Sequence, residues 1–212
     1  MNTTPDALLA SNLQQLPLVA ILRGLTPVEA PAIGQALTSA GFVLLEVPLN
    51  SPQPLDSIAA LCAQHPELLI GAGTVMSATD VRNVHAAGGR LIISPHFDAE
   101  VVHEALRLGL ACMPGVATPS EAFAALKAGA HALKLFPAEM IAPNVVKALR
   151  AVLSASVPLL PVGGIGPDNM GAYKKAGATG FGIGSSLYKP GQSAAQTLAL
   201  AQHFVHNWRA IA

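Results

Sequence analysis

Lys134 lies between Leu133 and Leu135 in the apolar run HALKLFPAE. Because side chains alternate along a strand, a strand here directs the Lys134 ammonium away from the face that both leucines share. Burial disfavours charged lysine, and a lysine with a lowered pKa is the nucleophile that attacks a ketone to form a Schiff base. A buried ion pair, or a side chain that reaches the rim of the sheet, is the structural alternative.

Glu46 is a second charged residue inside an apolar run, LLEVPL. A desolvated carboxyl group has a raised pKa, so it holds and releases a proton near neutral pH. Schiff-base formation and protonation of an enamine both need such a group. A salt bridge between Glu46 and Lys134 is the purely structural explanation of the same two residues.

Two glycine-rich segments, PVGGIGPDN and GFGIGSSLY, contain the ends of the last two apolar runs. Gly163, Gly164, Gly184 and Ser185 offer backbone amides there, and many parallel α/β barrels bind phosphate through amides at these two places. Tight turns that require glycine would explain one such segment. Two successive segments favour a phosphate site.

Two further polar residues end apolar runs. Arg23 closes PLVAILRG and is suited to pair with a carboxylate or phosphate, unless it is simply solvated. Thr74, in GAGTV, offers a hydroxyl to a substrate carboxylate or to a water, and capping of the next turn is the alternative.

Metal ligands are not evident in the sequence. His203 and His206 lie one helical turn apart in the predicted terminal helix, far from the other candidate residues. Cys62 and Cys112 lack the CxxC spacing of a zinc site and are interpreted as buried small hydrophobic residues. We therefore expect no metal and no organic cofactor.

The elements that position these residues are eight short apolar runs, each followed by Gly, Pro, Ser or Asn, which predict buried strands. They span 17–22, 42–49, 68–73, 90–95, 110–115, 131–137, 157–164 and 180–185. Capped segments of helical period separate several of them. In residues 26–41, for example, Thr26 is the expected N-cap and Gly41 the terminator.

The alternation of strands and helices predicts the fold class. Strands that are apolar on both faces need helices on both sides or closure, and eight units favour an α/β (β/α)8 TIM barrel. We expect a single domain, residues 1–212, with a short N-terminal helix across its bottom. A doubly wound open sheet is the alternative, but no GxGxxG follows the first run. In a barrel, Glu46 lies four strands before Lys134 and therefore opposite it.

Charge and hydropathy limit the partners. Twelve basic and twelve acidic residues give a formal net charge of zero, so no overall field attracts nucleic acid or an anionic membrane. The sequence begins without a signal-peptide pattern and has no run of eighteen apolar residues. We expect a cytoplasmic protein whose partner is a small molecule.

Taken in order, AILRG, LLEVPLNSP, GAGTV, ALKLFPAE, PVGGI and GIGSSLY resemble the aldolases of 2-keto-3-deoxy-6-phospho sugar acids across nearly the whole chain. The resemblance implies a Schiff base on Lys134, proton transfer by Glu46 and contact of Thr74 with the pyruvyl portion. It also implies a phosphorylated keto-deoxy sugar acid as substrate, pyruvate and D-glyceraldehyde 3-phosphate as products, and a homotrimer.

Two positions distinguish branches of this family. The gluconate branch typically reads LEVTLR where this chain reads LEVPLN, so Asn50 replaces a basic residue and Arg23 is left to hold the substrate carboxylate. Val162 replaces the Thr that usually precedes the paired glycines, as in the galactonate branch. The substrates of the two branches differ only in configuration at C4. A methyl group of Val162 in place of the Thr hydroxyl near C4 favours the galactonate epimer without making the preference absolute.

Three rival functions remain open at this stage. A phosphosugar epimerase or isomerase would use acid and base groups without a covalent lysine. A non-catalytic phosphosugar-binding barrel would use Lys134 and Glu46 only as an ion pair. A metal-dependent aldolase would require a ligand cluster that is not evident.

Overall fold

Short parallel strands form the interior of the computed structural model, which describes residues 4–211. One sheet has the strand order β5-β4-β3-β2-β1-β9, and a second has the order β6-β7-β8. The strands are β1 Leu18–Ile21, β2 Leu44–Pro48, β3 Leu69–Gly73, β4 Leu91–Ile93, β5 Ala111–Met113, β6 Gly115–Val116, β7 Leu133–Leu135, β8 Leu159–Pro161 and β9 Phe181–Ile183. Neighbours follow chain order from β1 to β5, so the doubly wound alternative is wrong.

Two features connect the sheets. Pro114 alone separates β5 from β6, and Val162, directly after β8, forms a parallel bridge with Gly182 of β9. The structure confirms an α/β fold of parallel strands alternating with helices. The prediction of eight strands in one barrel is met only in part, because the strands pair into two sheets. The fifth predicted strand is divided at Pro114, which has no N–H to donate to a neighbouring strand.

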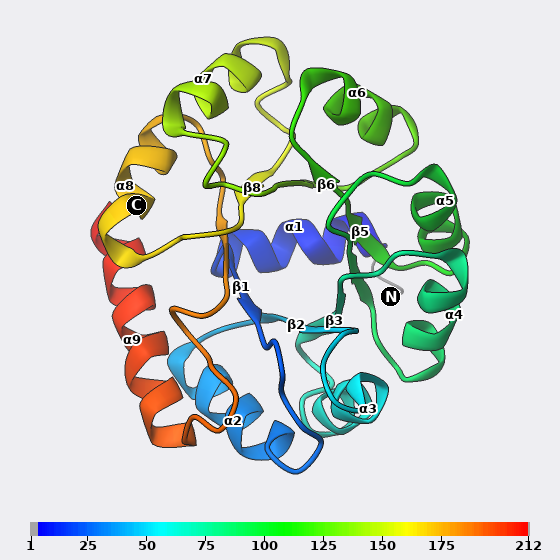
Figure 1. Ribbon diagram of the computed structural model, residues 1–212, viewed down its shortest axis with the longest axis vertical. Coiled ribbons are helices and arrows are strands. Elements are labelled where there is room, and N and C mark those ends of the chain that lie inside the picture. The colour runs from blue at the N-terminus through cyan, green and yellow to red at the C-terminus, as the bar shows by residue number, and fades with distance from the viewer. Residues whose placement is uncertain (1–3, 212) are drawn as a thin grey trace.

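Helices surround the strands (Figure 1). They are α1 Pro5–Gln15, α2 Ala30–Ala40, α3 Pro54–Gln64, α4 Ala78–Ala86, α5 Ala99–Arg107, α6 Pro119–Lys127, α7 Pro143–Val152, α8 Pro167–Lys175 and α9 Ala194–Ile211. The predicted cap of α2 needs a correction. Thr26 and Glu29 form reciprocal hydrogen bonds, but they close a turn and the helix begins only at Ala30. Gly41 ends α2 with a φ of 97°, as predicted.

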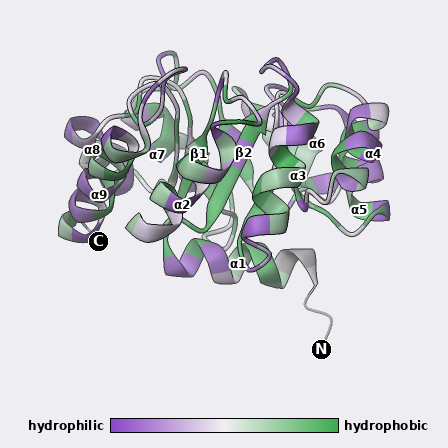
Figure 2. Cartoon of the chain, turned by 90° about the horizontal axis from the view of Figure 1, so that it is seen from below, coloured by the Kyte–Doolittle hydropathy of each residue, from purple (hydrophilic) through white to green (hydrophobic). Residues whose placement is uncertain are grey.

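α1 covers one end of the strands, as predicted (Figures 1 and 2). Its leucines Leu9 and Leu13, with Leu16 at its C-cap, are buried in the hydrophobic core. Because α1 leads directly into β1, the covered end is the amino end of the parallel strands. The loops that carry the candidate residues leave the carboxyl ends, at the opposite side of the molecule.

Hydropathy follows the same arrangement, with apolar strands inside and polar residues on the outer faces of the helices (Figure 2). β1, β2 and β3 are buried along their whole length. Within residues 4–211, none of the helices combines the length and apolar character needed to cross a membrane.

Candidate active site

Lys134 and Glu46 face the same interior space. Residues paired between parallel strands point to the same side of the sheet, and so do residues two positions apart on one strand. Lys134 of β7 pairs with Leu160, and Val162, two residues further on, pairs with Gly182 of β9. Gly182 pairs with Val19 of β1, and Ile21, two residues further on, pairs with Glu46 of β2. The period-two argument from the sequence therefore gave the correct face for both charged residues.

Lys134, the central residue of β7, is 6% exposed. Burial lowers the pKa of its ammonium and Arg23 acts in the same direction, whereas the negative charge of Glu46 opposes both. Its Nζ lies 4.6 Å from the centre of the Phe136 ring, which holds the cation against an aromatic face. Lys134 is thus a buried amine that loses its proton more readily than an exposed lysine.

Glu46, in β2, is 2% exposed. Burial raises the pKa of its carboxyl group to about 7, although Lys134, Arg23 and a hydrogen bond from the Gly73 backbone lower it. Its Oε2 is buried and has no hydrogen-bond partner among the described residues. A β-carbon on Gly73 would overlap with this carboxylate, so a larger residue there would displace the Glu46 side chain.

The salt-bridge explanation is wrong at the level of direct contact. Among the described residues, no ion pair joins Lys134 to Glu46, although each charge influences the pKa of the other. A lone buried carboxylate oxygen is costly in a structural role, because an unpaired polar atom loses its hydration. The same oxygen is available to exchange a proton with a bound molecule.

Thr74 follows β3 with a φ of 57°. A β-branched residue is strained in this conformation, and such strain concentrates at functional sites. Capping does not explain the residue, because Ser77 is the N-cap of α4 and accepts a hydrogen bond from the backbone N–H of Asp80. Thr74 is half-buried at the carboxyl end of its strand, as the sequence predicted.

Arg23 is exposed, but its guanidinium is not simply solvated. Its Nη1 donates a 2.8 Å hydrogen bond to Oδ1 of Asn50, which connects the loop after β1 to the loop after β2. Asn50, which stands where the gluconate branch has a basic residue, therefore orients Arg23, the residue predicted to bind the substrate carboxylate.

The predicted anion site lies in a cavity of about 760 Å³ at the carboxyl ends of β1, β7, β8 and β9. All five remaining candidates line it, together with Arg23: Val162, Gly163, Gly164, Gly184 and Ser185. Lys134, Glu46 and Thr74 are not lining residues. Lys134 contacts the lining residue Phe136, and Glu46 is paired in the sheet with the lining residue Ile21.

One hydrogen bond joins the two glycine-rich loops, and another lies within the first of them. Ser186 Oγ donates a 2.7 Å hydrogen bond to the Ile165 carbonyl, and Asn169 Nδ2 donates one of 2.8 Å to the Gly164 carbonyl. Gly163 and Gly164 have φ values of 113° and 60°, which other residues rarely adopt. One contact between the loops and one within the first loop thus preorganise them.

Sequence reasoning missed several residues that line this cavity. Each lies within six residues of a predicted residue, but no spacing rule identified any of them: Glu139, Asp168, Asn169, Ser186, Tyr188 and Lys189. Glu139 is the most notable, because β-carbons added at Gly163 and Gly164 would approach its side chain. Its place in ALKLFPAE, five residues after Lys134, was the available signal.

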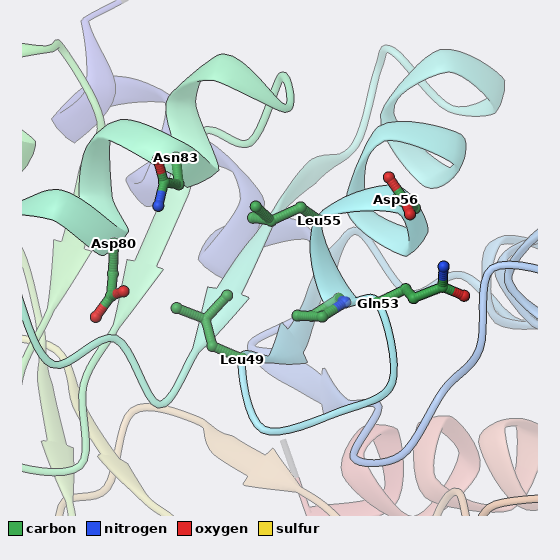
Figure 3. A pocket seen from close by; sticks show the side chains of 7 residues that line it. Leu49, Gln53, Leu55, Asp56, Asp80 and Asn83 are labelled. Atoms are coloured by element: carbon green, nitrogen blue, oxygen red, sulfur yellow. The ribbon is translucent and has the colours of Figure 1, made fainter.

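A second cavity of about 370 Å³ lies between α3 and α4. Asp56 and Asp80 lie on opposite sides of it, with Leu49 and Leu55 between them (Figure 3). Among the described residues, aspartates are its only charged lining residues, so it would repel an anionic ligand. The larger cavity, which is lined by Arg23 and Lys189, is the better candidate for an anionic ligand.

Comparison with known proteins agrees with this geometry. A family model described as KDPG and KHG aldolase matches residues 9–199. The 2-dehydro-3-deoxy-6-phosphogalactonate aldolase of Escherichia coli (strain K12) is 45% identical, over 92% of this chain and 96% of the relative. A probable enzyme of the same name from Rhizobium meliloti (strain 1021) is 47% identical over 84% of each chain. A structure titled "Native KDPGal structure" has a TM-score of 0.91 at 44% identity, covering 93% of this chain and 96% of the other.

Proposed function

This chain belongs to the KDPG and KHG aldolase family, and from that premise we propose that Lys134 and Glu46 carry out a class I aldolase reaction. The protein is an aldolase, a carbon–carbon lyase that acts on 2-dehydro-3-deoxy-6-phosphogalactonate in galactonate catabolism. One observation supports the residue roles above all. A buried lysine with a lowered pKa shares an inner face with a buried glutamate whose pKa is raised to about 7.

The covalent steps begin with the neutral amine. Lys134 Nζ attacks C2 of the ketone to form a carbinolamine, and Glu46 supplies the proton with which its hydroxyl departs as water. In the iminium that remains, Glu46, now a carboxylate, removes the proton of the C4 hydroxyl directly or through water. The C3–C4 bond breaks, its electron pair enters the iminium system, and D-glyceraldehyde 3-phosphate leaves.

Release of the second product reverses the roles. Glu46 returns its proton to C3 of the enamine, and water hydrolyses the new iminium to give pyruvate and free Lys134. A pKa near 7 suits this alternation of acid and base. The steps need no metal and no organic cofactor, so we expect cleavage to be insensitive to chelators.

The remaining groups bind the two ends of the substrate. Arg23, oriented by Asn50, holds the carboxylate, and Thr74 contacts the pyruvyl portion. Backbone amides at Gly163, Gly164, Gly184 and Ser185 bind the phosphate, and this remote binding energy helps to position the reacting carbons. Val162 lines the same cavity and favours the galactonate configuration at C4.

Pyruvate release from each C4 epimer tests this assignment. We expect faster cleavage of the galactonate form, and loss of more than about a thousandfold in Lys134→Ala, because no other group forms the iminium. Lys175→Ala, which removes an exposed lysine from α8, should retain full activity. Borohydride with pyruvate should leave a covalent adduct on the wild type and none on Lys134→Ala.

Other outcomes would select the rivals. Preference for the gluconate epimer would overturn the use of Asn50 and Val162 but keep the mechanism. An epimerase or isomerase would convert substrate without a trapped adduct, and a binding barrel would bind phosphosugar without cleavage. Inhibition by chelators would favour a metal-dependent aldolase.

We further propose that the strands close into a single (β/α)8 barrel and that residues 1–212 are one domain. The bridge between Val162 and Gly182, the single residue between β5 and β6, and one continuous core cluster support this. A homotrimer is carried over from the family resemblance, and a cytoplasmic location is the expectation from the sequence pattern. Light scattering coupled to size-exclusion chromatography would give three times the mass of one chain, and fractionation would recover the protein with cytoplasmic enzymes.

A further inference from the structure

The side chains around the large cavity carry no net positive charge, although its glycine amides suit a phosphate. Arg23 and Lys189 contribute two positive charges, and Glu139 and Asp168 contribute two negative ones. The Glu139 side chain lies against Gly163 and Gly164, beside the proposed phosphate position. A phosphate monoester carries about −1.5 to −2 charges at neutral pH, so a nearby cation is needed to offset the carboxylate.

Lys189 is the cation on the phosphate side. It lies on the segment between β9 and α9, four residues after Ser185, and lines the cavity with both glycine-rich loops. Arg23, in the neighbouring loop after β1, is already hydrogen-bonded to Asn50 in the loop after β2. Within residues 4–211, no carboxylate forms an ion pair with Lys189. Its side chain is exposed at the rim, between the cavity and a shallower outer hollow, and is available to an incoming anion.

The backbone on both sides of Lys189 is anchored. Tyr188 is 2% exposed, and its backbone N–H donates to the Gly184 carbonyl at 3.1 Å. After Lys189, Pro190 packs against Gly24, and the Gly191 N–H donates to Glu29 Oε1 at 3.2 Å. The loop after β9 is thereby joined to the loop after β1.

The acceptor of that last hydrogen bond is itself held. Glu29 Oε2 accepts from the Thr26 hydroxyl at 2.6 Å and from the Thr26 N–H at 3.1 Å. The carbonyl of Lys189 accepts from the Gln192 N–H at 3.0 Å, which closes a turn. A fixed backbone with a free ammonium places a cation reproducibly beside the glycine loops and leaves its tip mobile.

We propose that Lys189 pairs with the substrate phosphate and makes the enzyme select phosphorylated over unphosphorylated keto-deoxy sugar acids. The inference rests on the proposed function and adds a charged specificity residue to the neutral amides of the two loops. The ammonium offsets Glu139 and reaches the phosphate from the rim. Lys189 does not touch the reacting carbons, so it acts on substrate binding and leaves the chemistry unchanged.

The test compares Lys189→Met with Lys175→Met, which removes the same charge from an exposed position on α8. For the phosphorylated galactonate acid, we expect KM to rise about tenfold in Lys189→Met with kcat nearly unchanged, as for loss of a partly exposed charge-assisted contact. For the unphosphorylated acid, kcat/KM should be the same in all variants. Lys189→Arg should restore most of the affinity, and added salt should weaken binding more in the wild type than in Lys189→Met.

Inorganic phosphate separates this inference from the proposed function. It should bind wild type and Lys175→Met alike in calorimetric titration, and Lys189→Met several-fold more weakly. Equal phosphate affinity in Lys189→Met and the wild type, or an equal loss of kcat/KM for both substrates, would overturn the role of Lys189. If the wild type cleaves neither epimer, the proposed substrate is wrong, and the phosphate titration still decides whether Lys189 binds phosphate.

Discussion

At the scale of single residues, the site depends on unfavourable burial of two ionisable groups. Glu46 and Lys134 are both almost inaccessible, and each has its pKa shifted towards the neutral form by burial. The unpartnered Oε2 of Glu46 and the positive φ of Thr74 add further local cost. Such costs are typical of functional sites, where a group is kept ready for chemistry at the expense of stability.

Glu46→Gln should therefore stabilise the fold in a pH-dependent way. The carboxyl pKa rises from 4.5 to about 7 on folding, so between these values the folded state binds more protons than the unfolded state. Wild-type stability then falls as the pH rises through this window, and the full penalty is present above pH 7. We expect a gain in the free energy of unfolding on the order of 2–3 kcal/mol at pH 8 and little gain at pH 4.

Urea unfolding followed by circular dichroism at several pH values measures this effect, and the same variant should lose aldolase activity. Glu100→Gln removes a carboxylate from an exposed position on α5 and serves as the control. If the stability difference between Glu46→Gln and the wild type were independent of pH, Glu46 would not be the buried acid described above.

At the scale of elements, loops from different strand ends hold one another in place. The loop after β1 is connected to the loop after β2 through Arg23 and Asn50, and to the loop after β9 through Glu29 and Gly191. The loops after β8 and β9 are connected through Ser186 and Ile165. The strands hold the ends of these loops in place, and the contacts between loops set the relative positions of the predicted binding groups.

Ser186→Ala tests the contact between the two glycine-rich loops. Loss of the 2.7 Å hydrogen bond to the Ile165 carbonyl frees two amide-bearing segments to move apart. We expect KM for the phosphorylated substrate to rise roughly threefold to tenfold, since one hydrogen bond contributes about 0.5–1.5 kcal/mol, while kcat and the melting temperature change little. Steady-state kinetics beside Ser39→Ala, an exposed serine on α2, provide the comparison. An unchanged KM would show that the loops are held by other contacts.

At the scale of the whole molecule, β9 lies at the point where the chain returns to its first strand. β9 pairs with β1, and Gly182 within it meets Val162 at the end of β8. Phe181 fixes this strand to the outer helices, because its ring packs edge-on against Tyr173 of α8 and Trp208 of α9, at centroid distances of 6.4 and 6.1 Å. The meeting of the two sheets thus depends on an aromatic cluster.

Phe181→Ala should weaken the whole molecule. Phe181 is fully buried, so the substitution leaves a cavity and should lower the free energy of unfolding by about 3–5 kcal/mol. Phe123→Ala is a matched control on α6, where the ring is 49% exposed, and it should cost less than about 1 kcal/mol. Denaturant unfolding monitored by the single tryptophan, Trp208, reports the transition directly. A similar loss of unfolding free energy in both variants would argue against a special role of the aromatic cluster around Phe181.

The sequence by itself determined that Lys134 and Glu46 face the interior, and it predicted the class of chemistry that they serve. Alternation within a strand placed Lys134 opposite its flanking leucines, and an isolated glutamate in an apolar run identified Glu46, because both signals depend only on near neighbours in the chain. Glycine-rich segments at two strand ends likewise predicted the anion loops.

Only the tertiary structure decided how these groups are arranged. The contacts of Arg23 with Asn50, Glu29 with Gly191 and Ile165 with Ser186 join residues far apart in the chain, and no local pattern encodes such a pairing. The same holds for Glu139 against the glycine loop and for Lys189 at the rim. Division of the predicted fifth strand at Pro114 also depended on how neighbouring strands pair. Residue type and period are local properties, whereas charge balance and loop position arise from packing.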